Sequence, residues 1–232
     1  MTDDLEGSES RFKAWMDERL RLIREDRDEV IVISGDERGG KSTLAFHMAL
    51  YMDPKFDPTT SICFTGAAYT RTSARLGRGR VIILDESISG GFSRDSGSEE
   101  NKGLIKYLTV AGERNQIHLV LWPNIRWLDK ALKEHRARWN IHIKARRADH
   151  AVAMVRLLKE GELTYDPPKN CFPFRYPKAY GPLWEKYKAA KADFVQSIGR
   201  GTDDSLVTAR EDLLDRQRSA LRPFLPEIFE QG

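Results

Sequence analysis

The sequence predicts an α/β domain in which a mainly parallel β-sheet is covered by helices on both faces. Short apolar runs rich in β-branched residues alternate with helical stretches along the first two thirds of the chain, and this alternation is typical of parallel sheets. A glycine-rich turn between the first such run and the next helix is the second indication. The chain has 232 residues, 40% of them hydrophobic and 31% charged, which fits one globular core with extensions.

The expected elements follow one another in a regular order. An amphipathic helix over residues 11–27 comes first, because its apolar side chains recur at helical spacing. Strands are expected where apolar residues occur in an unbroken run, the pattern of a strand buried on both faces. The expected strands are residues 30–33, 61–64, 81–84, 117–122 and 139–144, and the helices between them are residues 41–52, 67–76, 101–114 and 125–135.

The last third of the chain is expected to extend this core. Residues 150–158 and 162–165 are predicted to form a strand pair around Gly161, and residues 166–177 a proline-punctuated, aromatic connector. Two charged helices, 182–198 and 203–218, are too polar to form a core alone. We therefore expect a domain over residues 1–160 that includes the N-terminal helix. Residues 161–232 would supply the connector and helices docked on that domain or on a neighbouring subunit.

The composition argues against several classes of protein. No stretch approaches the ~18 consecutive apolar residues of a membrane span, and the acidic N-terminus lacks the order of a secretion signal. We expect no membrane partner and a cytoplasmic location. The two cysteines have no partner spacing for zinc or a structural disulfide. A net charge of +3 does not by itself indicate nucleic acid, and arginine-rich stretches at 71–80 and 130–147 are either solvated faces or DNA contacts.

A phosphate-binding loop is predicted directly after the first strand. The segment GDERGGKST matches the Walker A pattern GxxxxGK[ST] between an apolar strand and a helix. Its glycines allow successive N–H groups to surround a β-phosphate, Lys41 can reach the β- and γ-phosphates, and the Ser42 hydroxyl can bind Mg²⁺. The alternative, a turn without a ligand, is disfavoured by the lysine, the serine and the context together. The expected ATP-binding residues are Gly35, Asp36, Glu37, Arg38, Gly39, Gly40, Lys41, Ser42 and Thr43.

Two carboxylates follow the strand at residues 81–84, in the manner of a Walker B motif. Asp85 is expected to hold Mg²⁺ through a water, and Glu86 to accept a proton from the water that attacks the γ-phosphate. Acidic residues at strand ends are also common caps, but the upstream phosphate loop favours the functional interpretation. ATP and Mg²⁺ are therefore the predicted cofactors.

The glutamate after Asp85 favours the additional-strand, RecA-like branch of P-loop NTPases, in which another strand lies between the phosphate-loop strand and the acidic strand. Residues 117–122 are the expected extra strand. Asn124 just beyond it either senses the γ-phosphate or forms a turn with Pro123. An arginine is also expected to stabilise the transferring phosphoryl group. Arg114 is the first choice, and Arg38, Arg126, Arg136 and Arg138 are the others, although each singly also fits a surface or salt-bridge arginine.

Several segments together resemble the compact RecA-like ATPases of viruses and mobile elements related to the FtsK/HerA translocases. That family includes genome-packaging ATPases and zonular-occludens-toxin-like assembly ATPases. The resemblance covers about residues 28–145. It is carried by GDERGGKSTLA, VIILDES, the Arg114-Asn115 pair before IHLVLWPN, LDK at 128–130 and the arginines before WNIHI. Pro123-Asn124 stands where these translocases often carry a glutamine.

The resemblance implies an oligomeric ring with nucleotide at the subunit interfaces and double-stranded DNA in the pore. The expected function is an Mg²⁺-dependent ATPase that couples hydrolysis to DNA translocation or genome packaging. A capsid or portal-type protein is a further expected partner, with the host cytoplasm or the virion as location if the protein is viral. The alternatives are an ATP-dependent switch or assembly factor and a helicase-loader-like accessory ATPase associated with DNA.

Overall fold

The structure is a computed structural model that describes residues 7–85, 114–128, 130–159, 162–163 and 171–199. The chain divides into two compact units, Met1–Ala190 and Lys191–Gly232, and the first contains the sheet and its helices. The helices are α1 (Ser8–Arg24), α2 (Lys41–Met52), α3 (Pro58–Ser61), α4 (Gly66–Arg75), the 3-10 helix η3 (Ile125–Trp127), α6 (Lys130–His135) and α7 (Pro182–Gly199). The strands are β1 (Glu29–Ser34), β2 (Ile62–Cys63), β3 (Val81–Asp85), β4 (Ile117–Trp122), β5 (Ala137–Arg146), β6 (His150–Lys159), β7 (Glu162–Leu163) and β8 (Cys171–Pro177).

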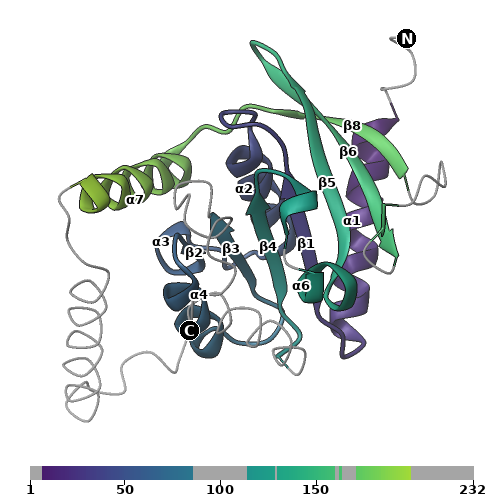
Figure 1. Cartoon of the computed structure of the whole chain (residues 1–232), viewed down its shortest axis with the longest axis horizontal. Coiled ribbons are helices and arrows are strands. Elements are labelled where there is room, and N and C mark those ends of the chain that lie inside the picture. The colour runs from purple at the N-terminus through teal and green to yellow at the C-terminus, as the bar shows by residue number, and fades with distance from the viewer. Residues whose placement is uncertain (1–6, 86–113, 129, 160–161, 164–170, 200–232) are drawn as a thin grey trace, which may run out of the picture. The chain divides into compact units, whose positions relative to one another are not determined.

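A mainly parallel sheet forms the centre of this unit, as predicted. Its strand order is β2-β3-β4-β1-β5-β6-β7, and β8 pairs with β6 (Figure 1). The strands from β2 to β5 in this order are all parallel, whereas β6 joins β5, β7 and β8 in antiparallel pairs. The strand β4 lies between β1 and β3, which confirms the expected extra strand between the phosphate-loop strand and the acidic strand.

The register of the parallel strands decides where the polar strand ends meet. Ser34 at the end of β1 pairs with Trp122 at the end of β4, and Asp85 at the end of β3 pairs with Leu121. Because parallel strands end on the same edge of the sheet, the loop after β1 and the carboxylate of Asp85 lie on one edge.

Both faces of the sheet are buried, because alternate residues of each apolar strand point to opposite sides. Ile31 and Ile33 of β1 pack in one cluster with side chains of α1 and α2, while Val30 and Val32 pack in another with Tyr69 of α4 and Leu132 of α6. All six residues of β1 and all six of β4 are buried, and apart from Glu29, Ser34 and His118 they are apolar, as expected for strands buried on both faces. No helix in the described ranges is long and apolar enough to cross a membrane.

The predicted connector over residues 166–177 is wrong for its second half, because residues 171–177 form β8 along β6. The prolines of this segment suggested a loop. Pro173 and Pro177 are tolerated because β8 lies beside β6 at the edge of the sheet, and such a strand donates few N–H hydrogen bonds. Phe172, Phe174 and Tyr176 alternate with them and are buried.

The other predicted elements within these ranges are present with shifted ends. The predicted helix 125–135 is divided into η3 and α6, and the predicted pair of strands around Gly161 is the β6–β7 pair. The expected helix 203–218 and all but the last residue of the expected helix 101–114 lie outside the described residues.

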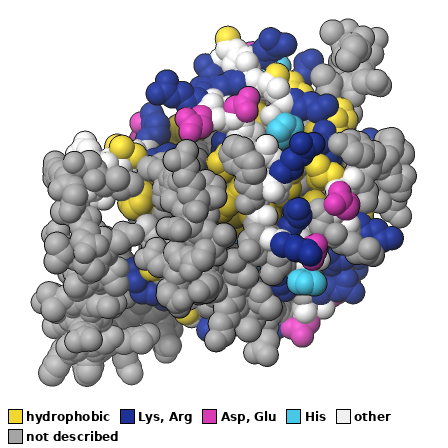
Figure 2. Space-filling model, in the orientation of Figure 1, with side chains coloured by type: hydrophobic (Ala, Val, Ile, Leu, Met, Phe, Trp, Pro, Cys, Tyr) yellow, Lys and Arg dark blue, Asp and Glu magenta, His cyan; other side chains and the backbone are white. Residues whose placement is uncertain are grey.

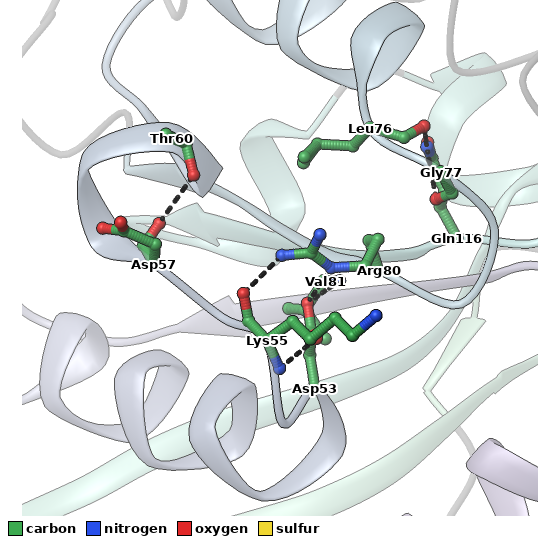
Figure 3. Close-up of polar contacts among 9 residues, drawn as sticks. All are labelled: Asp53, Lys55, Asp57, Thr60, Leu76, Gly77, Arg80, Val81 and Gln116. Atoms are coloured by element: carbon green, nitrogen blue, oxygen red, sulfur yellow. Dashed lines mark hydrogen bonds and ion pairs between the residues drawn. The ribbon is translucent and has the colours of Figure 1, made fainter. Parts of the chain in front are cut away.

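A buried aspartate connects the end of α2 to the beginning of β3. Asp53 is 3% exposed and accepts hydrogen bonds from the backbone N–H of Lys55 (2.9 Å) and of Val81 (3.2 Å). Its carboxylate also pairs with Arg80 Nε at 2.7 Å (Figure 3). Arg78 nearby pairs with Asp26. Two of the arginines in the basic stretch 71–80 are therefore held in ion pairs within the chain.

Candidate functional site

The loop between β1 and α2 has a backbone that requires glycine at two positions. Gly35 has φ 146°, and a Cβ atom there would lie 2.9 Å from the Cβ of Ile143 on β5. Gly40 has φ 111°, and its Cβ would lie 2.8 Å from the hydroxyl oxygen of Tyr176 on β8. Positive φ is the region that L-residues with a side chain avoid. Backbone conformation and close neighbours therefore both require glycine at these two positions of the predicted motif.

Lys41, the first residue of α2, turns back over this loop. Its side chain is buried, with a relative exposure of 4%, and Nζ donates hydrogen bonds to the carbonyl oxygens of Gly35 (2.7 Å) and Asp36 (2.8 Å). The ammonium group thus lies inside the curve of the loop. This is the place from which a lysine can transfer its hydrogen bonds to phosphate oxygens.

Ser42 and Asp85, the two predicted magnesium ligands, are in contact. The Ser42 hydroxyl donates a hydrogen bond to Asp85 Oδ2 at 2.9 Å, and Asp85 is completely buried at the end of β3. Glu86, predicted as the hydrolytic carboxylate, lies outside the described residues.

The donor set fits a magnesium ion that arrives with a polyphosphate. A hydroxyl and a carboxylate oxygen are hard ligands, and Mg²⁺ commonly takes one or two protein oxygens together with phosphates and waters. Within the ranges that the structure describes, no group of three or more His, Cys, Asp or Glu side chains could hold a metal by itself. Ser42 and Asp85 would therefore share the ion with a ligand.

A second hydroxyl reaches the same carboxylate. Tyr187 of α7 donates a hydrogen bond to Asp85 Oδ2, and its side chain is 3% exposed. Burial, and then the charge of Asp85, raise the pKa of Tyr187 above its usual value, so the phenol stays protonated at neutral pH. The sequence predicts a charged helix over residues 182–198, but nothing in it predicts this contact.

A small open pocket lies beside the loop, with Gly40 and Thr43 on one wall. Its other walls include the basic side chains of Arg146, Arg147, His150 and Lys178, together with Tyr176. Figure 2 shows Lys and Arg side chains gathered around the hairpin of β5 and β6, from which several of these residues come. The surroundings of this pocket favour an anionic ligand.

Two contacts attach the pocket wall to the loop. The Tyr176 hydroxyl donates to the carbonyl of Gly40 (3.2 Å), and Arg146 Nη1 donates to the carbonyl of Arg38 (2.7 Å). Sequence reasoning missed Tyr176 because its segment reads as a connector. The alternation of Phe172, Phe174 and Tyr176 is the strand signal that could have found it.

Asn124 lies at the same edge of the sheet as the loop. The carbonyl of Pro123, just before it, accepts a hydrogen bond from the N–H of Gly35 at 3.2 Å. The Asn124 side-chain oxygen accepts from the N–H of Arg126 at 3.0 Å and caps η3. The turn-forming role is therefore present, and a role toward a phosphate stays a prediction.

Arg114 lies at the opposite edge. It precedes β4, so it is near the amino ends of the strands, and its guanidinium donates to the carbonyl of Ala74 at 2.8 Å. It does not approach the loop of its own chain. Arg136 is also engaged, because it pairs with Asp28 at the start of β1. An arginine that acts at this site from position 114 would have to belong to a neighbouring subunit.

Comparison with known proteins finds similarity among solved structures. No family model matches the sequence, and a search of curated proteins finds no match. Among solved structures, the chain is similar to the N-terminal domain of zonular occludens toxin from Neisseria meningitidis, with 17% sequence identity and a TM-score of 0.45. The similarity covers 68% of this chain and 98% of that domain. A similarity at this level says nothing about activity, so the functional case rests on the geometry of the loop and of Asp85.

Proposed function

We propose that the chain is an Mg²⁺-dependent ATPase of the RecA-like, additional-strand type of P-loop NTPase. One observation carries the proposal: the Ser42 hydroxyl lies 2.9 Å from the carboxylate of Asp85, which comes from a strand two places away in the sheet. This contact requires that β1 and β3 end at the same edge of the sheet. A glycine-rich turn without a ligand would not require it.

The phosphates would bind at the loop and the beginning of α2. Lys41 would exchange the carbonyls of Gly35 and Asp36 for β- and γ-phosphate oxygens, and the loop N–H groups would surround the β-phosphate. The α2 helix has 12 residues, so its N-terminal dipole adds to the attraction. Thr43 and the basic side chains beyond Gly40 would lie near the α-phosphate.

The chemistry assigned to the residues is hydrolysis of the terminal phosphoanhydride. When bound, magnesium would neutralise charge on the β- and γ-phosphates, held by the Ser42 hydroxyl and, through a water, by Asp85. Glu86 would orient the attacking water and accept its proton as the bond to the γ-phosphorus forms. The bond from that phosphorus to the bridging oxygen then breaks, leaving ADP and phosphate. Asn124 would orient the same water, and Arg114 would act from a neighbouring subunit.

The test is nucleotide binding and turnover by the purified chain and three variants. Lys41→Ala should weaken Mg-ATP binding by at least ~10-fold, since a charge-assisted contact to phosphate is worth about 1.5–3 kcal/mol. Glu86→Gln should bind ATP and not hydrolyse it. Lys13→Ala is the matched control, because Lys13 is exposed and pairs only with Glu9 among the contacts described. Wild-type protein without affinity for Mg-ATP would refute the proposal.

We further propose that the ATPase works as an oligomeric ring on double-stranded DNA, as a translocating or packaging motor with a capsid or portal-type partner. The basic side chains around the β5–β6 hairpin support a polyanionic partner in addition to the nucleotide. Duplex DNA should stimulate ATP turnover, and the Glu86→Gln variant should form a larger species in ATP.

The alternative is an ATP-dependent switch, assembly factor or helicase-loader-like accessory protein. The contact from Tyr187 to Asp85 favours it, because α7 would then respond directly to events at the metal. Slow turnover that is insensitive to DNA, by a protein that stays monomeric in ATP, would support this alternative and exclude the motor.

A further inference from the structure

Four aromatic rings anchor α7 beside the carboxylate of Asp85. Trp184 and Tyr187 lie one turn apart on α7 and stack with their centroids 4.9 Å apart. Trp184 contacts the ring of Phe46 on α2 edge-on at 5.1 Å, and Tyr187 stacks on Phe64, just after β2, at 6.4 Å. Phe46 is one helical turn beyond Ser42. The rings therefore hold α7 against the two elements that border the site.

This packing directs the Tyr187 hydroxyl toward Asp85. The ring is buried and its position is fixed on both faces, so the hydroxyl is directed at Asp85 Oδ2. Ser42 donates to the same oxygen at 2.9 Å. Two donors, one on α2 and one on α7, therefore hold the same carboxylate oxygen.

We propose that Tyr187 is a positioning residue for the magnesium site, which holds Asp85 in the orientation that the metal-bound water needs. The inference rests on the proposed nucleotide site and adds α7 to it. A carboxylate rotates easily about its last side-chain bond, because that torsion is broad. When the Ser42 hydroxyl turns from Asp85 to the metal, the tyrosine still donates to the carboxylate. Mutation of a residue that orients a metal ligand in this way commonly lowers metal affinity or activity by 10–100-fold.

The experiment measures magnesium binding by the protein–ADP complex of wild type and Tyr187→Phe. The phenylalanine keeps the ring packing and removes only the hydroxyl. ADP affinity is measured by calorimetry in buffer with EDTA. Mg²⁺ is then titrated into the ADP complex in buffer without EDTA. We expect Mg²⁺ affinity to fall by about 10-fold or more, with ADP affinity in EDTA unchanged. ATP turnover should show a raised Mg²⁺ requirement and a kcat that largely recovers at saturating Mg²⁺.

Two controls separate the hydroxyl from its surroundings. Tyr51→Phe removes an equivalent tyrosine–aspartate hydrogen bond, to Asp17 at 2.9 Å, on the exposed part of α2 and should change nothing at the site. Trp184→Phe keeps the hydroxyl but alters a ring that orients it, so it should lower Mg²⁺ affinity less than Tyr187→Phe does. Mg²⁺ affinity that is equal in Tyr187→Phe and wild type would overturn the inference.

A comparison in the Asp85→Asn background gives a second test. Because the tyrosine acts through the carboxylate, adding Tyr187→Phe to Asp85→Asn should cause no further loss of Mg²⁺ affinity, and a further loss would contradict the inference. Failure of the proposed function gives a different result, since wild-type protein would then bind no ADP or ATP, with or without Mg²⁺.

Discussion

Replacing Gly40 by alanine should destabilise the fold by an amount that the structure allows to be divided into two parts. A side chain at φ 111° costs roughly 1–2 kcal/mol from backbone strain alone. The new Cβ would also lie 2.8 Å from the Tyr176 hydroxyl oxygen, closer than real contacts allow. The ring must then shift and weaken its hydrogen bond to the Gly40 carbonyl, which costs about 1 kcal/mol. The expected loss in free energy of unfolding is therefore about 2–3 kcal/mol.

The assay is urea unfolding of Gly40→Ala, Tyr176→Phe and the double variant. Removing the hydroxyl removes the clash, so the double variant should be about 1 kcal/mol more stable than the sum of the single losses predicts. Gly77→Ala is the matched control, because a Cβ atom at that position would meet no described neighbour within 4 Å and its φ is not positive. It should change stability by less than about 0.5 kcal/mol. Strictly additive losses in the cycle would refute the assigned contact between Gly40 and Tyr176.

Two further predictions concern buried carboxylates. Asp53→Ala leaves Arg80 and two backbone N–H groups without their acceptor, so the free energy of unfolding should fall by roughly 3 kcal/mol, seen as a lower urea midpoint; an unchanged midpoint would contradict the role of this cluster. Burial raises the pKa of Glu29 from 4.5 to about 7 against the opposing charge of Arg19, so the stability contributed by its protonated form is complete below pH 4.5 and is lost as the pH rises through 7. The loss is roughly 3 kcal/mol, at about 1.36 kcal/mol per pH unit, and Glu29→Gln should remove it. The measurement compares the urea midpoints of variant and wild type at about pH 5 and pH 8. Identical pH profiles of the two proteins would exclude this role of Glu29.

The parallel part of the sheet could be predicted because its signal is local. A strand such as β1 or β4 is buried on both faces, so nearly every residue of it is apolar or small and the run is visible without knowing its neighbours. Lys41, which comes after the loop that follows β1, and Asp85, at the end of β3, then locate the site, since parallel strands end at the same edge of the sheet.

The antiparallel part could not be predicted in the same way because its signal is not local. Residues 171–177 form a strand because they pair with β6, which is distant in the sequence. Within this segment, the prolines on one face of β8 obscure the alternation of aromatic residues on its buried face. The contact of Tyr187 with Asp85 was also inaccessible, since it requires the position of α7 on the rings of Phe46 and Phe64. No pattern within α7 specifies that position.

The same contacts explain how a short motif acquires a defined shape. Ile143 of β5 and Tyr176 of β8 leave no space for a side chain at Gly35 and Gly40. Tyr187 of α7 donates a hydrogen bond to Asp85. Each partner lies in the later part of the chain, whereas the loop and the carboxylate lie in the first part. The motif therefore specifies which atoms face the ligand, and the later strands and α7 restrict how far those atoms can move. This is why the decisive experiments on the site change tyrosines outside the motif as well as the lysine, serine and carboxylates within it.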